Sequence, residues 1–480
     1  MSKSVYTRPQ DGQRSGKAVV MGASISGLWT ARALIDHFEE VVLLERDHLP
    51  EGPDYRPGAP QARQYHGLLL SGLQLMRDWF PGLEQELIEA GAVPYDIMND
   101  SRVRIRQRWY PQFPSDLILL SCSRLLLESS IRQRLRQNPC IRFVEGVEVV
   151  GLQSDSARGR VTGVRVRNYR GGTALQEADA VFPADLVVDA LGRRSKTPEW
   201  LRELGYAPPG ESVVDSFLGY VTRKYKRKPD TPLLLIGATP PDHPYGGLIL
   251  PEENDTMVAL IAGFNKNYPP TDPLEFDRFT HRLGPEFEEA LRDAEPITQP
   301  YGYRGTSSCW RHYEQLERWP ERLVVLGDAF CGFNPIYGQG MLAAAQSAAA
   351  LAEAIRRNHG DLDGVAQATL QQIGKITEGI WLLATSADLE WPGTEGGTVS
   401  QRPADRFGRW YINQLLDATA SDRTVWLQFN AVSQLTQPAT TLFAPGIFMR
   451  VMKHALLQKI QRRREPLTSE PPERSDLAES

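Results

Sequence analysis

The feature that most constrains the fold is a glycine-containing loop between two short apolar segments near the N-terminus. Residues 17–21 form an apolar run, Gly22-x-Ser24-x-x-Gly27 follows, and a second apolar run at 41–44 ends in Glu45. This order is typical of a strand, a tight turn, a helix and a second strand, in which the turn brings backbone N–H groups to a pyrophosphate. Ser24 replaces the usual middle glycine and adds a hydroxyl that can bond a phosphate. The pattern predicts a dinucleotide-binding unit in which Glu45, about 20 residues after the loop, binds ribose hydroxyls.

A second glycine-containing segment lies far along the chain, at residues 323–341. A short apolar run precedes Gly327-Asp328, a proline-containing turn follows, and Gly338-Gln339-Gly340 opens an alanine-rich helical stretch. A helix start offers free N–H groups to a partner of negative character, and an acid at a strand end can accept hydrogen bonds from hydroxyls. This combination suits a ligand with a polyol and an electron-poor ring, and FAD is such a ligand.

Composition narrows the class of protein. The chain has 480 residues, which exceeds one ordinary domain, and its net charge of -5 gives no support for a nucleic-acid partner. The four cysteines are scattered without C-x-x-C spacing, which argues against a zinc site or a disulfide framework and fits a cytoplasmic location. No apolar run reaches the roughly 18 residues needed to span a bilayer, so we expect no transmembrane segment.

The periodicities predict an α/β protein (α+β overall) with a discontinuous first domain. We expect a Rossmann-like FAD-binding domain over 17–205 and 300–360, part of whose segment 70–120 faces substrate. Alternating segments predict a β-rich, antiparallel substrate domain inserted over 206–299. The remaining expectations are a flexible N-terminus over 1–16, a helical region over 361–463 and a disordered tail over 464–480.

Local patterns also predict individual elements. Continuous helices are expected over 66–80, 275–293 and 341–356, and a strand over 141–150.

Several motifs together resemble those of a known enzyme family. The glycine loop, Glu45-Arg46, Arg124-x-x-Leu127 and the run from Gly327-Asp328 to Gly340 resemble the motif set of single-component flavoprotein monooxygenases, which have the para-hydroxybenzoate hydroxylase fold. The match extends over most of residues 17–360. A closer similarity, to the polyene epoxidases of polyether biosynthesis such as the lasalocid-pathway enzyme, lies in the segments 58–66, 121–124, 334–338 and 381–386.

The resemblance implies a role in FAD binding for each matched residue. Gly22, Ser24 and Gly27 would hold the pyrophosphate, and Glu45 the ribose. Arg46 would lie against the adenosine moiety, and Arg124 would reach the phosphates or the ribityl chain. Asp328 would bind a ribityl hydroxyl. The residues expected near the isoalloxazine are Pro335, Gly338, Gly340 and Met341.

One segment departs from the family pattern. Hydroxylases of this fold often carry an Asp-Gly pair that serves nicotinamide use, but here Leu191 stands where the acid is usual, before Gly192, and Asp189 lies two positions early. The electron source therefore stays open. NAD(P)H would act directly, or a flavin or ferredoxin reductase would deliver the electrons.

The chemistry is expected to reside in the cofactor, because no Ser-His-Asp set, metal cluster or paired carboxylate stands out in the sequence. The resemblance implies that one oxygen atom of O2 is transferred through a flavin C4a-hydroperoxide. An olefin would need no side-chain base, and we identify no base for a phenol. These points favour epoxidation of a lipophilic polyketide or terpenoid-type metabolite.

Three alternatives stay open beside epoxidation: an aromatic hydroxylase of the same fold, a flavin halogenase, and a non-catalytic binding protein of the FAD fold. The Trp-x-Trp-x-Ile-Pro stretch of halogenases is absent. No catalytic side chain is assigned, although His66 either approaches the flavin or caps and packs a helix start. The aromatic residues at 381, 391, 429, 443 and 448 form either a helical core or an apolar wall for substrate.

Overall fold

The computed structural model describes residues 16–169, 179–397 and 402–464. The chain forms two compact units, residues 1–399 and 400–480. The segments expected to be flexible or disordered at the two ends fall almost wholly outside the described residues.

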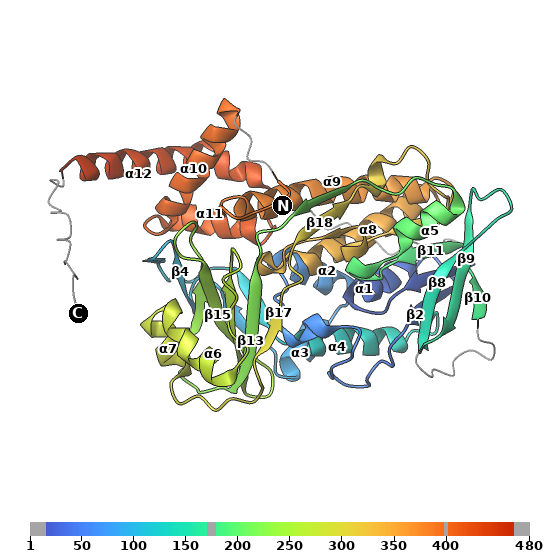
Figure 1. Ribbon diagram of the computed structural model, residues 1–480, viewed down its shortest axis with the longest axis horizontal. Coiled ribbons are helices and arrows are strands. Elements are labelled where there is room, and N and C mark those ends of the chain that lie inside the picture. Colours follow the sequence, from blue (N-terminus) through green and yellow to red (C-terminus); the bar gives the residue numbers. More distant parts are fainter. Residues whose placement is uncertain (1–15, 170–178, 398–401, 465–480) are drawn as a thin grey trace, which may run out of the picture. The chain divides into compact units, whose positions relative to one another are not determined.

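A parallel sheet forms the centre of the first unit (Figure 1). Its five strands have the order β19-β11-β1-β2-β7, and every neighbouring pair is parallel. The bounds are Lys17–Met21 (β1), Glu40–Glu45 (β2), Ile141–Glu145 (β7), Leu186–Asp189 (β11) and Leu323–Val325 (β19). The apolar runs of the sequence become these strands because parallel strands are buried on both faces. Both glycine segments therefore follow carboxyl ends of strands in one sheet, where ligands of this architecture bind.

Helices pack beside this sheet. α1 (Ile25–Leu34) lies against α4 (Arg124–Arg136) and α8 (Gly340–Arg357), and α8 packs in turn on α9 (Val365–Asp388). Small residues on α8 allow the close approach, since Ala344, Ala345 and Ala348 are almost fully buried. The sequence-based start of this helix was correct to within one residue.

An antiparallel sheet packs on β2 and β11. It consists of β8 (Val147–Ser154), β9 (Val161–Asn168) and β10 (Asp179–Pro183), and α5 (Thr197–Leu204) packs near it. The expected strand over 141–150 is wrong as a single element. Gly146, with φ of 72°, separates β7 from β8, because the chain must leave the parallel sheet there.

The second large sheet has seven strands in the order β17-β13-β16-β15-β14-β4-β5. From the inserted region come β13 (Gly219–Lys226), β14 (Leu233–Ile236), β15 (Tyr245–Glu252) and β16 (Thr256–Gly263). The pairs among β13, β14, β15, β16 and β17 are antiparallel, as predicted. Elsewhere in the chain lie β17 (Tyr301–Tyr303), β4 (Ser101–Ile105) and β5 (Arg108–Trp109), and β4 joins β14 in parallel.

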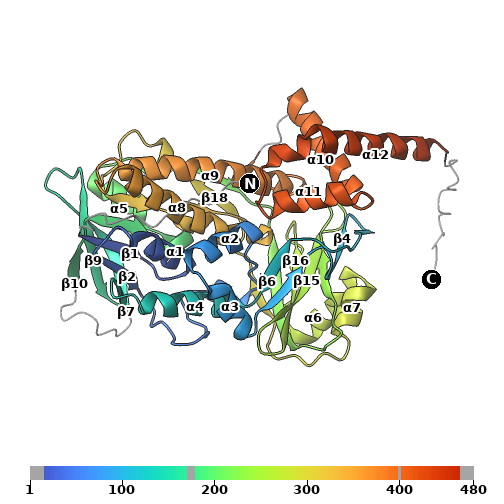
Figure 2. The ribbon, with the colours of Figure 1, turned by 180° about the vertical axis from the view of Figure 1, so that it is seen from behind.

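One face of this sheet is covered by two short helices (Figure 2). These are α6 (Pro273–Phe279) and α7 (Pro285–Leu291), whose Phe276 and Phe287 are fully buried against the sheet. The expected continuous helix over 275–293 is wrong. Gly284 adopts φ of 104° and Pro285 follows it, so the helix ends and a new one begins.

Shorter elements complete the first unit. The helix expected over 66–80 begins only at residue 70, and residues 64–69 are not helical. This helix is α2 (Leu70–Trp79), and α3 (Leu83–Glu89) follows it. β3 (Val93–Asp96) pairs with β6 (Ile118–Ser121). A further small sheet contains β12 (Glu211–Val214), β18 (Ser308–Arg311) and β20 (Cys331–Gly332).

The second unit is helical. Its described helices are α10 (Pro403–Thr419), α11 (Arg423–Ser433) and α12 (Pro445–Arg464). Tyr411 is buried at the centre, where its ring stacks on Phe443 at 4.8 Å and Phe448 at 5.3 Å. Phe448 packs against the helical core of this unit, whereas Phe443 is 45% exposed. Among the described residues of both units, no helix is long and apolar enough to cross a membrane.

Candidate functional site

The glycine loop closes tightly over the start of α1. Gly22 has φ of 101° and donates to the carbonyl of Leu44 at 2.8 Å. A Cβ on Gly27 would lie 1.9 Å from the Gly22 oxygen, so only glycine fits there. Ser24 is the N-cap of α1 but makes no side-chain capping bond. The first N–H groups of α1 therefore stay available to an anion, as a pyrophosphate requires.

Ser24 and Arg124 meet directly, although they lie on different elements. Arg124 donates from Nη2 to Ser24 Oγ at 2.8 Å and from Nε to Glu128 at 3.2 Å. Ser24 Oγ donates to Glu128 at 3.2 Å. The cation is buried beside the uncapped end of α1, where it strengthens the attraction for negative charge.

Glu45 holds the loop from the end of β2. Its Oε2 accepts from the Ala23 N–H at 3.0 Å, and its Oε1 accepts from the Asp47 N–H at 3.2 Å. The carboxylate is buried and also pairs with Arg56 at 3.2 Å. Glu45 thus connects β2 to the loop. Arg46 lies apart from these contacts, with its guanidinium 5.9 Å from the ring centre of Tyr169.

Arg56 is a buried cation that sequence reasoning missed. It contacts Glu45 at 3.2 Å, Asp47 at 3.2 Å and Glu128 at 3.1 Å. Burial acts to raise the pKa of Glu128, but the charges of Arg124 and Arg56 outweigh it, so this pKa lies below its ordinary value. Arg56 opens a Pro/Gly-rich loop in the sequence, and no local pattern links it to three distant acids.

The second glycine segment packs on the first. Gly327 has φ of 61°, and a Cβ there would lie 2.5 Å from Ser26 Oγ on α1. Asp328, which is partly exposed, has Arg193 Nε at 3.5 Å. A Cβ on Gly340 would lie 3.8 Å from Asp328 Oδ1, so the two predicted residues are neighbours. Arg193 was not predicted, and it also donates to the carbonyl of Ser307 at 2.6 Å.

A short 3-10 turn, Pro335–Tyr337, leads into α8. Gly338 follows with φ of 68°, and the nearest atoms to a Cβ there would be Leu69 Cδ2 at 3.6 Å and the Gly67 oxygen at 3.8 Å. Gln339 is the N-cap of α8 and makes no side-chain capping bond. Met341 is buried within the helix packing.

Two amide oxygens near these turns are buried without a hydrogen-bond partner among the described residues: Oε1 of Gln339 and Oε1 of Gln64. The start of α8 is uncapped as well. Unpaired buried polar atoms and free helix N–H groups fit an FAD molecule, whose ring and phosphates carry complementary groups.

The positive charge of Arg124 acts on His66. Its Nδ1 donates to the Gln64 carbonyl at 2.9 Å, which leaves Nε2 as an acceptor. Burial, assisted by the charge of Arg124, lowers the pKa of His66 to about 3. The imidazole is therefore neutral and only weakly basic near neutral pH.

The segment that departs from the hydroxylase pattern, around Asp189 and Leu191, is held by internal hydrogen bonds. Asp189 is fully buried and accepts from Leu191 N–H at 2.9 Å, from Thr197 Oγ1 at 2.7 Å and from Ser195 Oγ. Burial raises the pKa of Asp189. The carboxylate therefore stabilises the turn, whereas Gly192 has φ of 76° and open space at its Cβ position.

An apolar cluster lies beside the Pro335–Tyr337 turn. Ile336 packs against a set of buried side chains from the seven-stranded sheet and the end of α9, namely Leu218, Tyr220, Leu260, Ala262, Phe264 and Trp391. Phe264 and Trp391 stack with ring centres 4.6 Å apart and planes at 12°. The cluster is buried core, and Ile336 of the turn packs against it.

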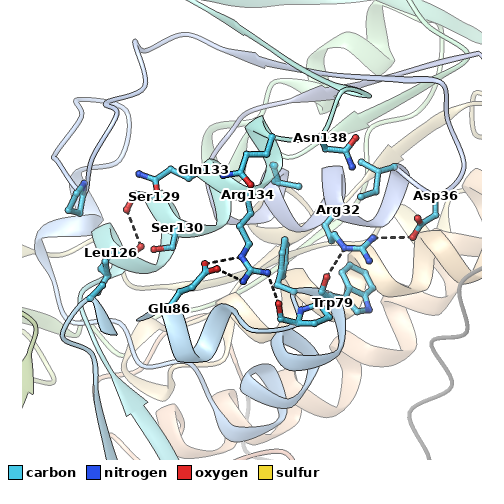
Figure 3. A pocket seen from close by; sticks show the side chains of 17 residues that line it. Arg32, Asp36, Trp79, Glu86, Leu126, Ser129, Ser130, Gln133, Arg134 and Asn138 are labelled. Atoms are coloured by element: carbon cyan, nitrogen blue, oxygen red, sulfur yellow. Dashed lines mark hydrogen bonds and ion pairs between the residues drawn. The ribbon is translucent and has the colours of Figure 1, made fainter. Parts of the chain in front are cut away.

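A separate cavity lies beside α1 and α4, away from the predicted residues (Figure 3). Its charged side chains pair within it: Arg134 contacts Glu86 at 2.7 Å, and Arg32 contacts Asp36 at 3.0 Å. None of the predicted cofactor-binding residues lines this cavity.

Comparisons with known proteins agree with this architecture. No protein-family model matches the chain. The chain is 30% identical to Protein Rv3254 of Mycobacterium tuberculosis over 484 aligned positions, covering 95% of this chain and 98% of that protein. PqsL of Pseudomonas aeruginosa, described as a probable FAD-dependent monooxygenase, superposes with a TM-score of 0.58 at 18% identity, covering 78% of this chain and 97% of PqsL.

The flavin-dependent brominase Bmp2 has the same architecture, with a TM-score of 0.61 at 15% identity over 93% of this chain and 99% of Bmp2. The chain thus has the fold shared by FAD-dependent monooxygenases and halogenases, as the sequence predicted. None of these three proteins is described as a polyene epoxidase.

Proposed function

This chain belongs to the same family as Protein Rv3254, and we propose that it is an FAD-dependent monooxygenase. One observation carries the proposal. The uncapped N-termini of α1 and α8 belong to helices that pack together, and the contact between Gly327 and Ser26 joins their two glycine segments. Two anion-attracting helix ends in one site suit the pyrophosphate and the flavin ring of a single extended cofactor.

Six of the predicted residues have a function in this proposal. Ser24, Arg124 and the first turn of α1 bind the pyrophosphate, and Glu45 orients the loop and the ribose. Asp328 accepts from a ribityl hydroxyl. The N–H groups at Gly340 and Met341 face the flavin ring, where the helix dipole favours negative charge. When bound and reduced, FAD supplies activation of O2 and transfer of one oxygen atom.

The environment of His66 favours an olefin as substrate. Hydroxylation of a phenol benefits from a base near neutral pH. With a pKa of about 3, His66 does not meet that need. Epoxidation of a carbon–carbon double bond requires no deprotonation of the substrate, so the neutral His66 agrees with the olefin epoxidation that we propose from the sequence resemblance.

We propose a lipophilic substrate with double bonds, of the polyketide or terpenoid type. The resemblance of the sequence to the polyene epoxidases supports this class. Phe264, Trp391 and Tyr220 are buried in the core beside the Pro335–Tyr337 turn. We propose NAD(P)H as the electron source. Because the segment around Asp189 departs from the hydroxylase pattern, delivery through a flavin or ferredoxin reductase stands beside direct use.

A halogenase is the second candidate, because the brominase Bmp2 shares the fold over nearly its whole length. The missing Trp-x-Trp-x-Ile-Pro stretch weighs against it. An aromatic hydroxylase shares the same cofactor requirement and differs only in its substrate.

The test starts from the full chain reconstituted with FAD. NADPH, with or without ferredoxin reductase, supplies electrons, and isotopically labelled O2 is provided with farnesol or with para-hydroxybenzoate. Labelled epoxide from farnesol supports the proposal, whereas labelled dihydroxybenzoate selects the hydroxylase. Bromide-dependent bromination selects the halogenase. Failure to bind FAD contradicts all three enzymes and favours a non-catalytic binding protein.

A further inference from the structure

A buried carboxylate at the end of α9 joins three parts of the first unit. Asp388 is fully buried, and its Oδ1 accepts three hydrogen bonds of 2.9 Å. The donors are Ser216 Oγ, from the segment before β13, and Asn334 Nδ2 and Tyr337 OH, which flank the Pro335–Ile336 turn. Asn334 is itself nearly fully buried. Asp388 therefore holds both ends of the turn that precedes α8.

No cation among the described residues forms an ion pair with this carboxylate. Its Oδ2 has no hydrogen-bond partner among the described residues, and the charged neighbour that acts on it, Asp215, is an acid. Burial raises the pKa of Asp388 to about 6, against the opposing effect of its hydrogen bonds. Burying an acid without a cation partner costs stability, so the hydrogen bonds of Asp388 to the turn point to a role other than stabilisation of the fold.

The turn has further internal bonds that depend on Asn334. Its Oδ1 accepts from the Ile336 N–H at 3.2 Å, and its own N–H donates to Ser308 Oγ at 2.9 Å. The Asn334 side chain thus bonds Asp388 with one end and the turn backbone with the other. Asn334 therefore links Asp388 to the Ile336 N–H, and Tyr337 bonds Asp388 directly from the other end of the turn.

The same helix end also shapes the apolar cluster. The Trp391 N–H donates to the Asp388 carbonyl at 3.1 Å, and the Trp391 ring stacks on Phe264. The Pro335–Tyr337 turn and the Phe264–Trp391 stack therefore both contact one short segment, residues 388–391.

We propose that Asp388 is a positioning residue that orients the 334–337 turn against the flavin ring and against the apolar cluster around Ile336. The contact between the turn and the flavin rests on the proposed function, whereas the hydrogen bonds between Asp388 and the turn do not. A purely structural role would affect folding alone. A positioning role also alters the bound flavin.

The experiment compares wild type with Asp388→Ala, Asp388→Asn and a control, Asp277→Asn. Asp277 likewise accepts a tyrosine hydroxyl, that of Tyr225 at 3.1 Å, but on α6. Hydrogen–deuterium exchange of the Ile336 amide is measured in the cofactor-free protein. The absorbance spectrum and the midpoint potential of bound FAD are measured in the reconstituted protein. Asp388→Ala should speed the exchange about tenfold, which corresponds to the loss of one hydrogen bond.

Asp388→Ala should also change the flavin spectrum and potential. Asp388→Asn, which keeps an acceptor of the same shape, should restore the exchange and the spectrum towards wild type, and Asp277→Asn should change neither. Unchanged exchange in Asp388→Ala would overturn the proposal, and so would faster exchange with an unaltered flavin. If wild type bound no FAD, the proposed function would fail, while the exchange measurement would still support or overturn the hold of Asp388 on the turn.

Discussion

Gly327 packs so closely on Ser26 that a Cβ atom at Gly327 would lie 2.5 Å from the serine Oγ. The two residues come from the two glycine segments, one after β19 and the other in the first turn of α1. Their contact brings the segments into one site.

Because of this contact, replacing Gly327 by any residue with a side chain should be unfavourable. Gly327→Val combines a steric overlap with a φ of 61°, which β-branched residues rarely adopt. We expect a loss of about 2–4 kcal/mol in the free energy of unfolding and weakened FAD binding. Chemical denaturation and FAD titration measure the two effects. Gly379→Ala on α9, where a Cβ meets open space, is the control, and equal behaviour of the two variants would contradict the packing argument.

Arg124 is expected to bind the FAD pyrophosphate. Arg124→Ala removes the cation beside Ser24 and should weaken FAD binding by about 1.5–3 kcal/mol, the value of a hydrogen bond to a charged group. Fluorescence titration of FAD checks this. Arg134→Ala changes another arginine of α4 that pairs with Glu86 instead, and its FAD affinity should stay at the wild-type value. Equal affinity of Arg124→Ala and wild type would remove Arg124 from the site.

His66 should not control the pH dependence of turnover near neutrality. Its pKa of about 3 keeps the ring neutral between roughly pH 5 and 8, a range in which an unperturbed histidine titrates. We therefore expect His66→Asn to leave the shape of the kcat/KM profile unchanged in this range. Loss of an inflection near pH 6.5 in the variant would show instead that His66 titrates during catalysis.

Asp388 should make stability depend on pH with a defined sign. Its pKa rises from 3.8 to about 6 on folding, so the stabilising contribution is full below the unfolded value and is lost as pH rises through 6. The free energy of unfolding of wild type, minus that of Asp388→Asn, should therefore fall by up to about 3 kcal/mol between roughly pH 4 and 7. Urea denaturation of both proteins across this range measures the difference. A difference that rises with pH would mean that the carboxylate is stabilised as an anion.

Much of the fold follows from local patterns. Apolar runs ending in Gly22 and Gly327 predicted two strands of the parallel sheet, and alternation predicted the antiparallel sheet after residue 212. Errors arose where single residues override periodicity. Gly146 and Gly284-Pro285 interrupt elements whose hydrophobic pattern continues across them.

The partners in the buried ionic network around Arg56 could not be predicted from the sequence. Arg56 lies in a Pro/Gly-rich loop, and its three acids come from β2, the residues after it and α4. The strands β4 and β5 were missed for a similar reason, since they extend one side of a sheet whose other strands lie more than a hundred residues later.

The sequence by itself determined the fold class and the two glycine segments, because backbone conformation and strand burial depend on neighbouring residues. Only the tertiary structure decided that Ser26 meets Gly327, that Arg56 joins Glu45 to Glu128, and that Asp388 holds Asn334 and Tyr337. Partners of this kind are selected by how whole elements pack. The energy of a buried charge or a close glycine contact exists only after distant segments have come together.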